Sequence, residues 1–150
     1  MKKFVFSLQA LFNYKLTVEK QQKAELSDAR QALRILLEEE QRLKDDYAGN
    51  ERSLEKALCD DKDIQTALNE HDAYFRFLRD ALKELRAKIA TAEKIVRKCQ
   101  MRLIVTMREI KTYNKLRDEQ YADYLIELKS EEGKEIDDLV SFNTITSIRL

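Results

Sequence analysis

The sequence contains no proline and no tryptophan, and only two glycines among its 150 residues. Proline removes a helix hydrogen bond, and an interior glycine costs a helix about 1 kcal/mol, so little in this composition forces a long helix to end. No apolar stretch approaches the roughly 20 residues that a membrane span requires. These absences favour long helices and predict a cytoplasmic protein without direct membrane insertion.

Residues that enzymes and metal sites commonly use are also scarce. His71 is the only histidine, and Cys59 and Cys99 are the only cysteines. A histidine-based triad, a two-histidine metal site and a disulfide framework are therefore not expected. Gly133-Lys134 lacks the earlier glycine and the following Ser or Thr of a phosphate-binding loop. We predict a non-enzymatic chain with no cofactor and no metal, in which His71 is solvent-exposed or caps a helix.

Charge is balanced overall but divided into bands along the chain. The net charge is +4 over residues 1–37, −7 over 38–72, +8 over 79–117 and −7 over 118–138. The total of zero and the absence of a recognised reading motif argue against nucleic acid as a partner. The bands are interpreted either as solvated helix faces or as surfaces that meet charged partners.

Two apolar seams run through the chain at alternating spacings of three and four. The second and cleaner seam comprises Phe75, Leu78, Leu82, Leu85, Ile89, Ala92, Val96, Cys99, Leu103, Thr106, Ile110 and Tyr113. The first comprises Leu26, Ala29, Leu33, Leu36, Glu40, Leu43, Tyr47, Asn50, Leu54, Ala57, Asp61, Ile64 and Leu68. A seam of this width buries one stripe of a helix, so each helix needs a partner helix. A phase slip before Leu26 predicts a stutter or local unwinding near residues 18–25.

The charged stretch Cys59–Asp63 is the strongest turn candidate, with Asp63 as the N-cap of the second helix. Two helices joined by a short turn run antiparallel. We therefore predict an all-α fold, a long antiparallel two-helix coiled-coil hairpin in a single domain. Its parts are helix 1 over about 4–58, a turn over about 59–63, helix 2 over about 64–138 and a flexible tail over about 141–150. This pairing places Leu26 near Cys99 and residue 4 near residue 120.

Apolar side chains exceed what the seams need at both ends of the predicted hairpin. Near the turn they are Tyr47, Tyr74, Phe75 and Phe77, and at the other end they include Phe4, Val5, Phe6, Leu8, Leu11 and Phe12. Either excess is interpreted as local packing or as an exposed docking patch.

Three stretches resemble the FliJ family of bacterial flagellar protein export. They are Phe6-Ser7-Leu8-Gln9-Ala10-Leu11 with Tyr14-Lys15 and Glu19, His71-x-x-Tyr74-Phe75-x-x-Leu78-x-x-Ala81-Leu82, and Glu131-x-x-Lys134-Glu135-Ile136-Asp137-Asp138-Leu139. Their order, together with the chain length and the hairpin layout, carries the resemblance. His71 departs from it, because the family often has an aromatic residue there, and so does the Thr- and Ile-rich stretch after Leu139.

The resemblance implies a non-enzymatic stalk and escort protein, located in the cytoplasm and peripherally associated with the inner-membrane export apparatus. Its terminal helices would enter a hexameric export ATPase, its tip would dock on the membrane export gate, and export chaperones are a further partner. By position, the gate contact patch is Tyr47, Tyr74, Leu78 and Ala81. The ATPase-facing end is Phe6, Leu8, Leu11, Glu131, Lys134, Asp137 and Asp138. Two alternatives remain: the equivalent stalk of a virulence type III secretion system, and a generic self-associating structural coiled coil.

Overall fold

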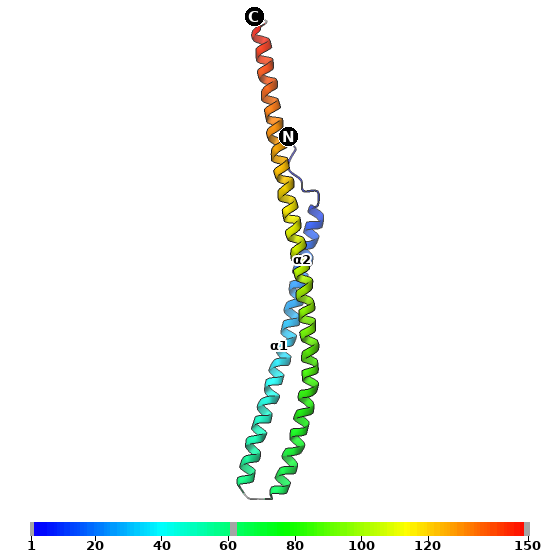
Figure 1. Cartoon of the computed structure of the whole chain (residues 1–150), viewed down its shortest axis with the longest axis vertical. Helices are drawn as coiled ribbons and strands as arrows, with labels where there is room; N and C mark the ends of the chain where they lie inside the picture. The colour runs from blue at the N-terminus through cyan, green and yellow to red at the C-terminus, as the bar shows by residue number, and fades with distance from the viewer. Residues whose placement is uncertain (1, 61–62, 149–150) are drawn as a thin grey trace. The chain divides into compact units, whose positions relative to one another are not determined.

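A computed structural model describes residues 2–60 and 63–148 of the chain. Those residues form two α-helices, α1 over Gln9–Cys59 and α2 over Ile64–Ile148, and contain no strand (Figure 1). The two helices pack against each other, so residues early in α1 meet residues late in α2. The predicted all-α helical hairpin is therefore confirmed.

The first helix begins at Gln9 and not at about residue 4 as the sequence predicted. Phe4 and Phe6 both pack in the same apolar cluster. Side chains two positions apart point about 200° apart on a helix but to one side of an extended chain. The segment before Gln9 therefore leaves the helical conformation, and both rings reach one surface.

The second helix ends at Ile148 and not at about 138, so residues 141–148 of the predicted flexible tail belong to the helix, and their flexibility stays a prediction. Residues 149–150 lie outside the described part of the chain. The hydroxyls of Thr144, Thr146 and Ser147 each donate to the carbonyl four residues earlier, at 2.7–2.8 Å. These bonds let Ser and Thr stay within a helix that no proline interrupts.

Between the helices, Asp61 and Lys62 of the predicted turn lie outside the described residues. Asp63 has a φ of 35°, in the left-handed region, and directly precedes α2. Its carboxylate accepts hydrogen bonds from the Thr66 backbone N–H at 3.4 Å and from the Thr66 hydroxyl at 2.6 Å. These bonds lower the pKa of Asp63, because only the charged carboxylate accepts both of them. The predicted N-cap is confirmed.

Contacts divide the chain into two compact units. The terminal unit comprises Met1–Glu19 and Val105–Leu150, and the turn unit comprises Lys20–Ile104. Each unit pairs a part of α1 with a part of α2. The single-domain description of the hairpin stays a prediction.

In the turn unit, Leu26, Val96 and Leu103 form a buried cluster against which Ala29, Leu33 and Cys99 pack. Leu26 therefore lies near Cys99, as the predicted pairing requires. All twelve positions of the α2 seam are buried or half-buried. The α1 seam holds up to Ala57 only, because Ile64 and Leu68 are exposed on the far side of the turn. Helix α1 is continuous across residues 18–25, so the predicted local unwinding is not observed.

In the terminal unit, the buried cluster is built from Phe6, Phe12 and Ile110. Phe4, Leu8, Leu16 and Tyr113 pack around it. Fully burying one such side chain contributes about 1.5–3 kcal/mol, so this small core is a substantial anchor for the start of the chain.

Candidate partner-binding surfaces

The segment before α1, residues 2–8, continues along α2 in the direction of α1 but without helical conformation, and we call it the N-terminal arm. The Phe4 ring meets Tyr121 edge-on at 5.1 Å between centroids and lies 5.6 Å from the ring of Tyr124. The Tyr124 hydroxyl donates to the Lys2 carbonyl at 2.9 Å. Residue 4 therefore lies beside residues 121–124, close to the position that the antiparallel pairing predicted.

The inner end of the arm is fixed by aromatic packing. Phe6 is 5% exposed and meets Phe12 edge-on, with the ring centroids 6.5 Å apart. Phe12 in turn meets Tyr113, and the Arg117 guanidinium stands 5.6 Å from the Phe12 ring centroid. Contacts of both kinds add to the stabilisation that burial alone gives. The arm is thus held as part of the terminal core.

The structure separates the residues predicted for the ATPase-facing end. Phe6 is buried and Leu8 half-buried, whereas Leu11 is 49% exposed. The four charged members, Glu131, Lys134, Asp137 and Asp138, are all exposed on α2. Eighteen residues of helix, about 27 Å, separate Glu131 from Tyr113, which packs beside Phe6. The predicted ATPase-facing set therefore falls into two separate groups. Phe6 and its neighbours Leu8 and Leu11 belong to the terminal core or its edge, and the four charged residues lie on an exposed segment of α2.

That exposed segment is residues 129–148 of α2, in which every side chain is exposed to solvent. It carries an apolar group that the sequence did not lead us to predict as a surface, namely Ile136, Leu139 and Val140. Their 3-and-4 spacing was the available signal. A hollow between the arm and α2 borders this segment and is lined by Lys2 and Lys3 on one side and by Asp123, Glu127 and Glu131 on the other.

Near the turn, two aromatic pairs differ in their surroundings. The ring of Tyr47 on α1 packs on Phe75 of α2 with centroids 4.7 Å apart, and both residues are half-buried. Tyr74 and Phe77 stack on each other at 6.3 Å and are 40% and 64% exposed. The first pair holds the helices together, and the second forms an apolar surface.

The predicted gate contact patch is therefore only partly a surface. Tyr74 is exposed and Tyr47 and Ala81 are half-buried, but Leu78 is 1% exposed and belongs to the core. Leu78 is a residue of the α2 seam and so points at α1. Phe77, which the predicted patch omitted, is the most exposed aromatic side chain in this region.

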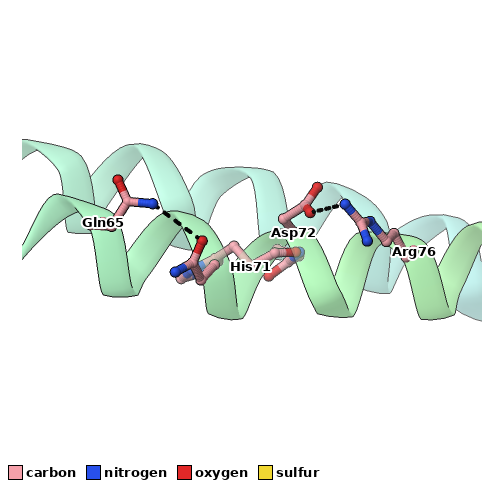
Figure 2. Close-up of polar contacts among 6 residues, drawn as sticks. Gln65, His71, Asp72 and Arg76 are labelled. Carbon is pink, nitrogen blue, oxygen red and sulfur yellow. Dashed lines mark hydrogen bonds and ion pairs between the residues drawn. The ribbon is translucent and has the colours of Figure 1, made fainter.

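A polar contact crosses the helices close to this patch. The buried side chain of Asn50 donates through Nδ2 to the His71 carbonyl at 3.2 Å. The His71 ring places Nδ1 2.7 Å from the Ala67 carbonyl, and because a carbonyl only accepts, Nδ1 carries the proton. Figure 2 shows His71 on α2 between Gln65 and the Asp72–Arg76 ion pair, whose N–O distance is 3.0 Å. His71 is half-buried and bonds within its own helix, so the predicted exposed or capping role is wrong.

The ion pair between Lys15 and Glu109 joins the helices in the terminal unit. The Lys15 ammonium of α1 lies 2.5 Å from the Glu109 carboxylate of α2. The hydrogen bond to Glu109 raises the pKa of Lys15, and the carboxylate charge adds to this effect while desolvation opposes it. The pair is partly exposed, so its contribution to stability is small.

Within residues 2–60 and 63–148, no group of three or more His, Cys, Asp and Glu side chains is arranged to hold a metal ion. In the same residues, no helix combines the length and the apolar character needed to cross a bilayer. Both cysteines are free thiols, with Cys59 exposed and Cys99 half-buried.

Similarity to known proteins is found at the level of a protein family. Neither a curated protein nor a solved structure matches the chain. The model of the FliJ family, described as flagellar FliJ protein, matches residues 4–149. That range includes the N-terminal arm from Phe4 onward and all of both helices. The chain therefore belongs to the FliJ family, the stalk and escort proteins of flagellar protein export.

Proposed function

We propose that the protein is a non-enzymatic stalk that inserts the free end of α2 into a hexameric flagellar export ATPase and docks its turn region on the membrane export gate. The observation that carries the proposal is the family match over residues 4–149, together with the full exposure of residues 129–148. The site of action is the cytoplasmic face of the inner-membrane export apparatus. Export chaperones are a further proposed partner.

The ATPase-facing surface is the exposed segment of α2. Glu131, Lys134, Asp137 and Asp138 supply charges that a ring of subunits can contact at several equivalent places, and such contacts are weak and sensitive to salt. The exposed apolar side chains on the same segment supply area that excludes water on binding. Phe6 and Leu8 contribute by holding the arm against α2, and Leu11 alone of the three offers its side chain directly.

The proposed gate-facing surface is the exposed Tyr74–Phe77 pair. Large aromatic side chains that are already stacked lose little rotamer freedom on binding, and they dominate many interfaces. Tyr47, Leu78 and Ala81 are buried or half-buried, so they offer a partner less side-chain area than Tyr74 and Phe77 do.

ATPase turnover and hexamer formation test the first contact. Adding the full chain to the purified cognate export ATPase should raise turnover and favour hexamers. Removing residues 131–150 should abolish both effects and leave the arm and the seam intact. Stimulation that is unchanged after this truncation would contradict insertion of α2. Circular dichroism of the truncated chain serves as the control, because the remaining residues should stay helical.

Binding to the cytoplasmic part of the gate protein tests the second contact. Replacing both Tyr74 and Phe77 by alanine should weaken binding at least about tenfold, as expected for interface aromatics. The Ile95→Ala variant is the matched control, because Ile95 lies elsewhere on α2 and its exposure, 51%, is between those of Tyr74 and Phe77. Equal losses in the two variants would refute the assignment. Stimulation of the ATPase should be unaffected in both.

A further inference from the structure

The outer face of α2 in the terminal unit carries exposed apolar side chains that no helix covers. Counting from Ile110 at a and Tyr113 at d of the seam, the positions farthest from α1 are b, c and f. Leu125 and Ile126 occupy b and c, Ile136 occupies f, and Leu139 and Val140 again occupy b and c. All five are exposed. We call this set the outer apolar face.

Charged side chains of both signs lie along the same face, basic up to Lys115 and mixed from Asp118 onward. Lys111 and Lys115 lie at b and f, Asp118 at b, Lys129 at f and Glu132 at b, and all are exposed. Positions b and f repeat at spacings of three and four, so the face has the geometry of a second heptad seam. In parallel register, a second copy would place each charge against its own kind, which is unfavourable.

An antiparallel second copy places charges of opposite sign opposite each other. When two α2 helices pair about the midpoint between residues 123 and 124, every b position faces an f position. Lys115 then faces Glu132 of the second copy, and Asp118 faces Lys129 of the second copy. Because the arrangement has twofold symmetry, each of these pairs occurs twice.

The same register also places apolar groups together. Leu125 faces Ala122 of the second copy at the centre, and Ile126 lies beside Tyr121 of the second copy. Farther out, Ile136 and Leu139 face the aliphatic stems of Lys111 and Arg108 of the second copy. We propose that the outer face of α2 in the terminal unit is a self-association surface, and that its occupant is a second copy of this chain bound antiparallel.

The inference rests on the residues of α2 and not on the proposed function. It has a consequence for that function, because the second copy covers part of the segment that would enter the ATPase. Self-association and ATPase binding would then exclude each other, and a paired form would hold the protein inactive until the ATPase is present.

Two charge-reversal variants, tested singly and mixed together, test the antiparallel pairing of α2 helices. Lys115→Glu alone and Glu132→Lys alone each place like charges opposite each other at two places in a homodimer. Each should weaken self-association of the full chain at least about tenfold at low salt, as measured by sedimentation. A one-to-one mixture of the two variants should associate as wild type does, because each reversed charge then meets its opposite in the other chain.

Control variants are chosen on α2 outside the proposed antiparallel contact. Lys83→Glu and Glu84→Lys reverse exposed charges at b and c of α2 outside the outer apolar face, and they should leave association unchanged. A wild-type chain that is monomeric at every concentration would overturn the proposal. So would dimers that the reversals do not weaken, or a mixture that fails to restore association.

Discussion

Adjacent side chains on α2 have opposite roles, which is clearest at positions 77 and 78. Leu78 is 1% exposed and Phe77 is 64% exposed. A helix turns by about 100° per residue, so one step along the chain moves a side chain from the core to solvent. The sequence identified Leu78 as a seam residue, yet the family resemblance also assigned it to a contact patch. The structure supports the seam role, and Phe77 is the better candidate for contact.

Alanine substitutions at these two positions should separate stability from binding. Leu78→Ala removes a buried side chain and should lower the free energy of unfolding by about 2–5 kcal/mol. Phe77→Ala should change it by no more than about 0.5 kcal/mol, because the ring is mostly in water. Chemical denaturation measures both. A destabilised Phe77 variant would show that its ring supports the fold and not a surface.

The cap at Asp63 should make the start of α2 sensitive to acid. Its pKa lies below the ordinary value of 3.8, so the folded state favours the carboxylate. The contribution is complete above that value and is lost as pH falls through the lowered pKa. The gap in melting temperature between wild type and Asp63→Ala should therefore shrink between about pH 5 and pH 2.

Asp63→Asn is the control for this experiment. Asparagine caps a helix about as well as aspartate but does not titrate. The gap between Asp63→Asn and Asp63→Ala should stay constant over the same pH range. A gap that changes equally in both comparisons would assign the acid effect to other carboxylates.

Among the structural elements, the N-terminal arm is the one that the sequence did not predict. Its apolar residues pointed correctly to packing at this end of the hairpin, but they were read as the first turn of a helix. Helical and extended segments both tolerate alternating apolar residues over so short a stretch, and the choice depends on where α2 offers partners. The rings of Tyr121 and Tyr124 decide it, because they accept Phe4 from an extended chain.

The arm should detach when its buried ring is removed. Phe6→Ala deletes a side chain in contact with Phe12, so the arm should open at a free energy well below that of global unfolding. Amide hydrogen exchange should then accelerate at Gln9 and Phe12, whose N–H groups bond to Phe6 and Leu8. Val5→Ala is the control, since Val5 is 79% exposed. Unchanged exchange in the Phe6 variant would show that Phe4 alone anchors the arm.

For the molecule as a whole, the heptad pattern predicted most of the fold and little of the surface. Twelve α2 positions were predicted as a seam, and all are buried or half-buried. Burial follows from side-chain spacing, which the sequence displays directly. The end of α2 was misplaced because the last residues of the helix continue neither seam, so the seam spacing does not mark them as helical. Contact patches were harder still to predict, because which exposed residues bind depends on a partner that the chain's own sequence does not contain.

The order of the seams along the chain has a consequence for synthesis. Leu26 of α1 packs against Val96 and Leu103, which follow it by about 70 residues. At a translation rate of about 5–20 residues per second, the apolar stripe of α1 waits several seconds or more on the ribosome for its partner. Tyr47 and Phe75 can meet first, and closure then spreads away from the turn, because contacts between residues near each other in sequence form fastest. The N-terminal arm is made first and can dock only after Tyr121 and Tyr124 emerge, so the nascent chain presents an unpaired helix to whatever meets it first.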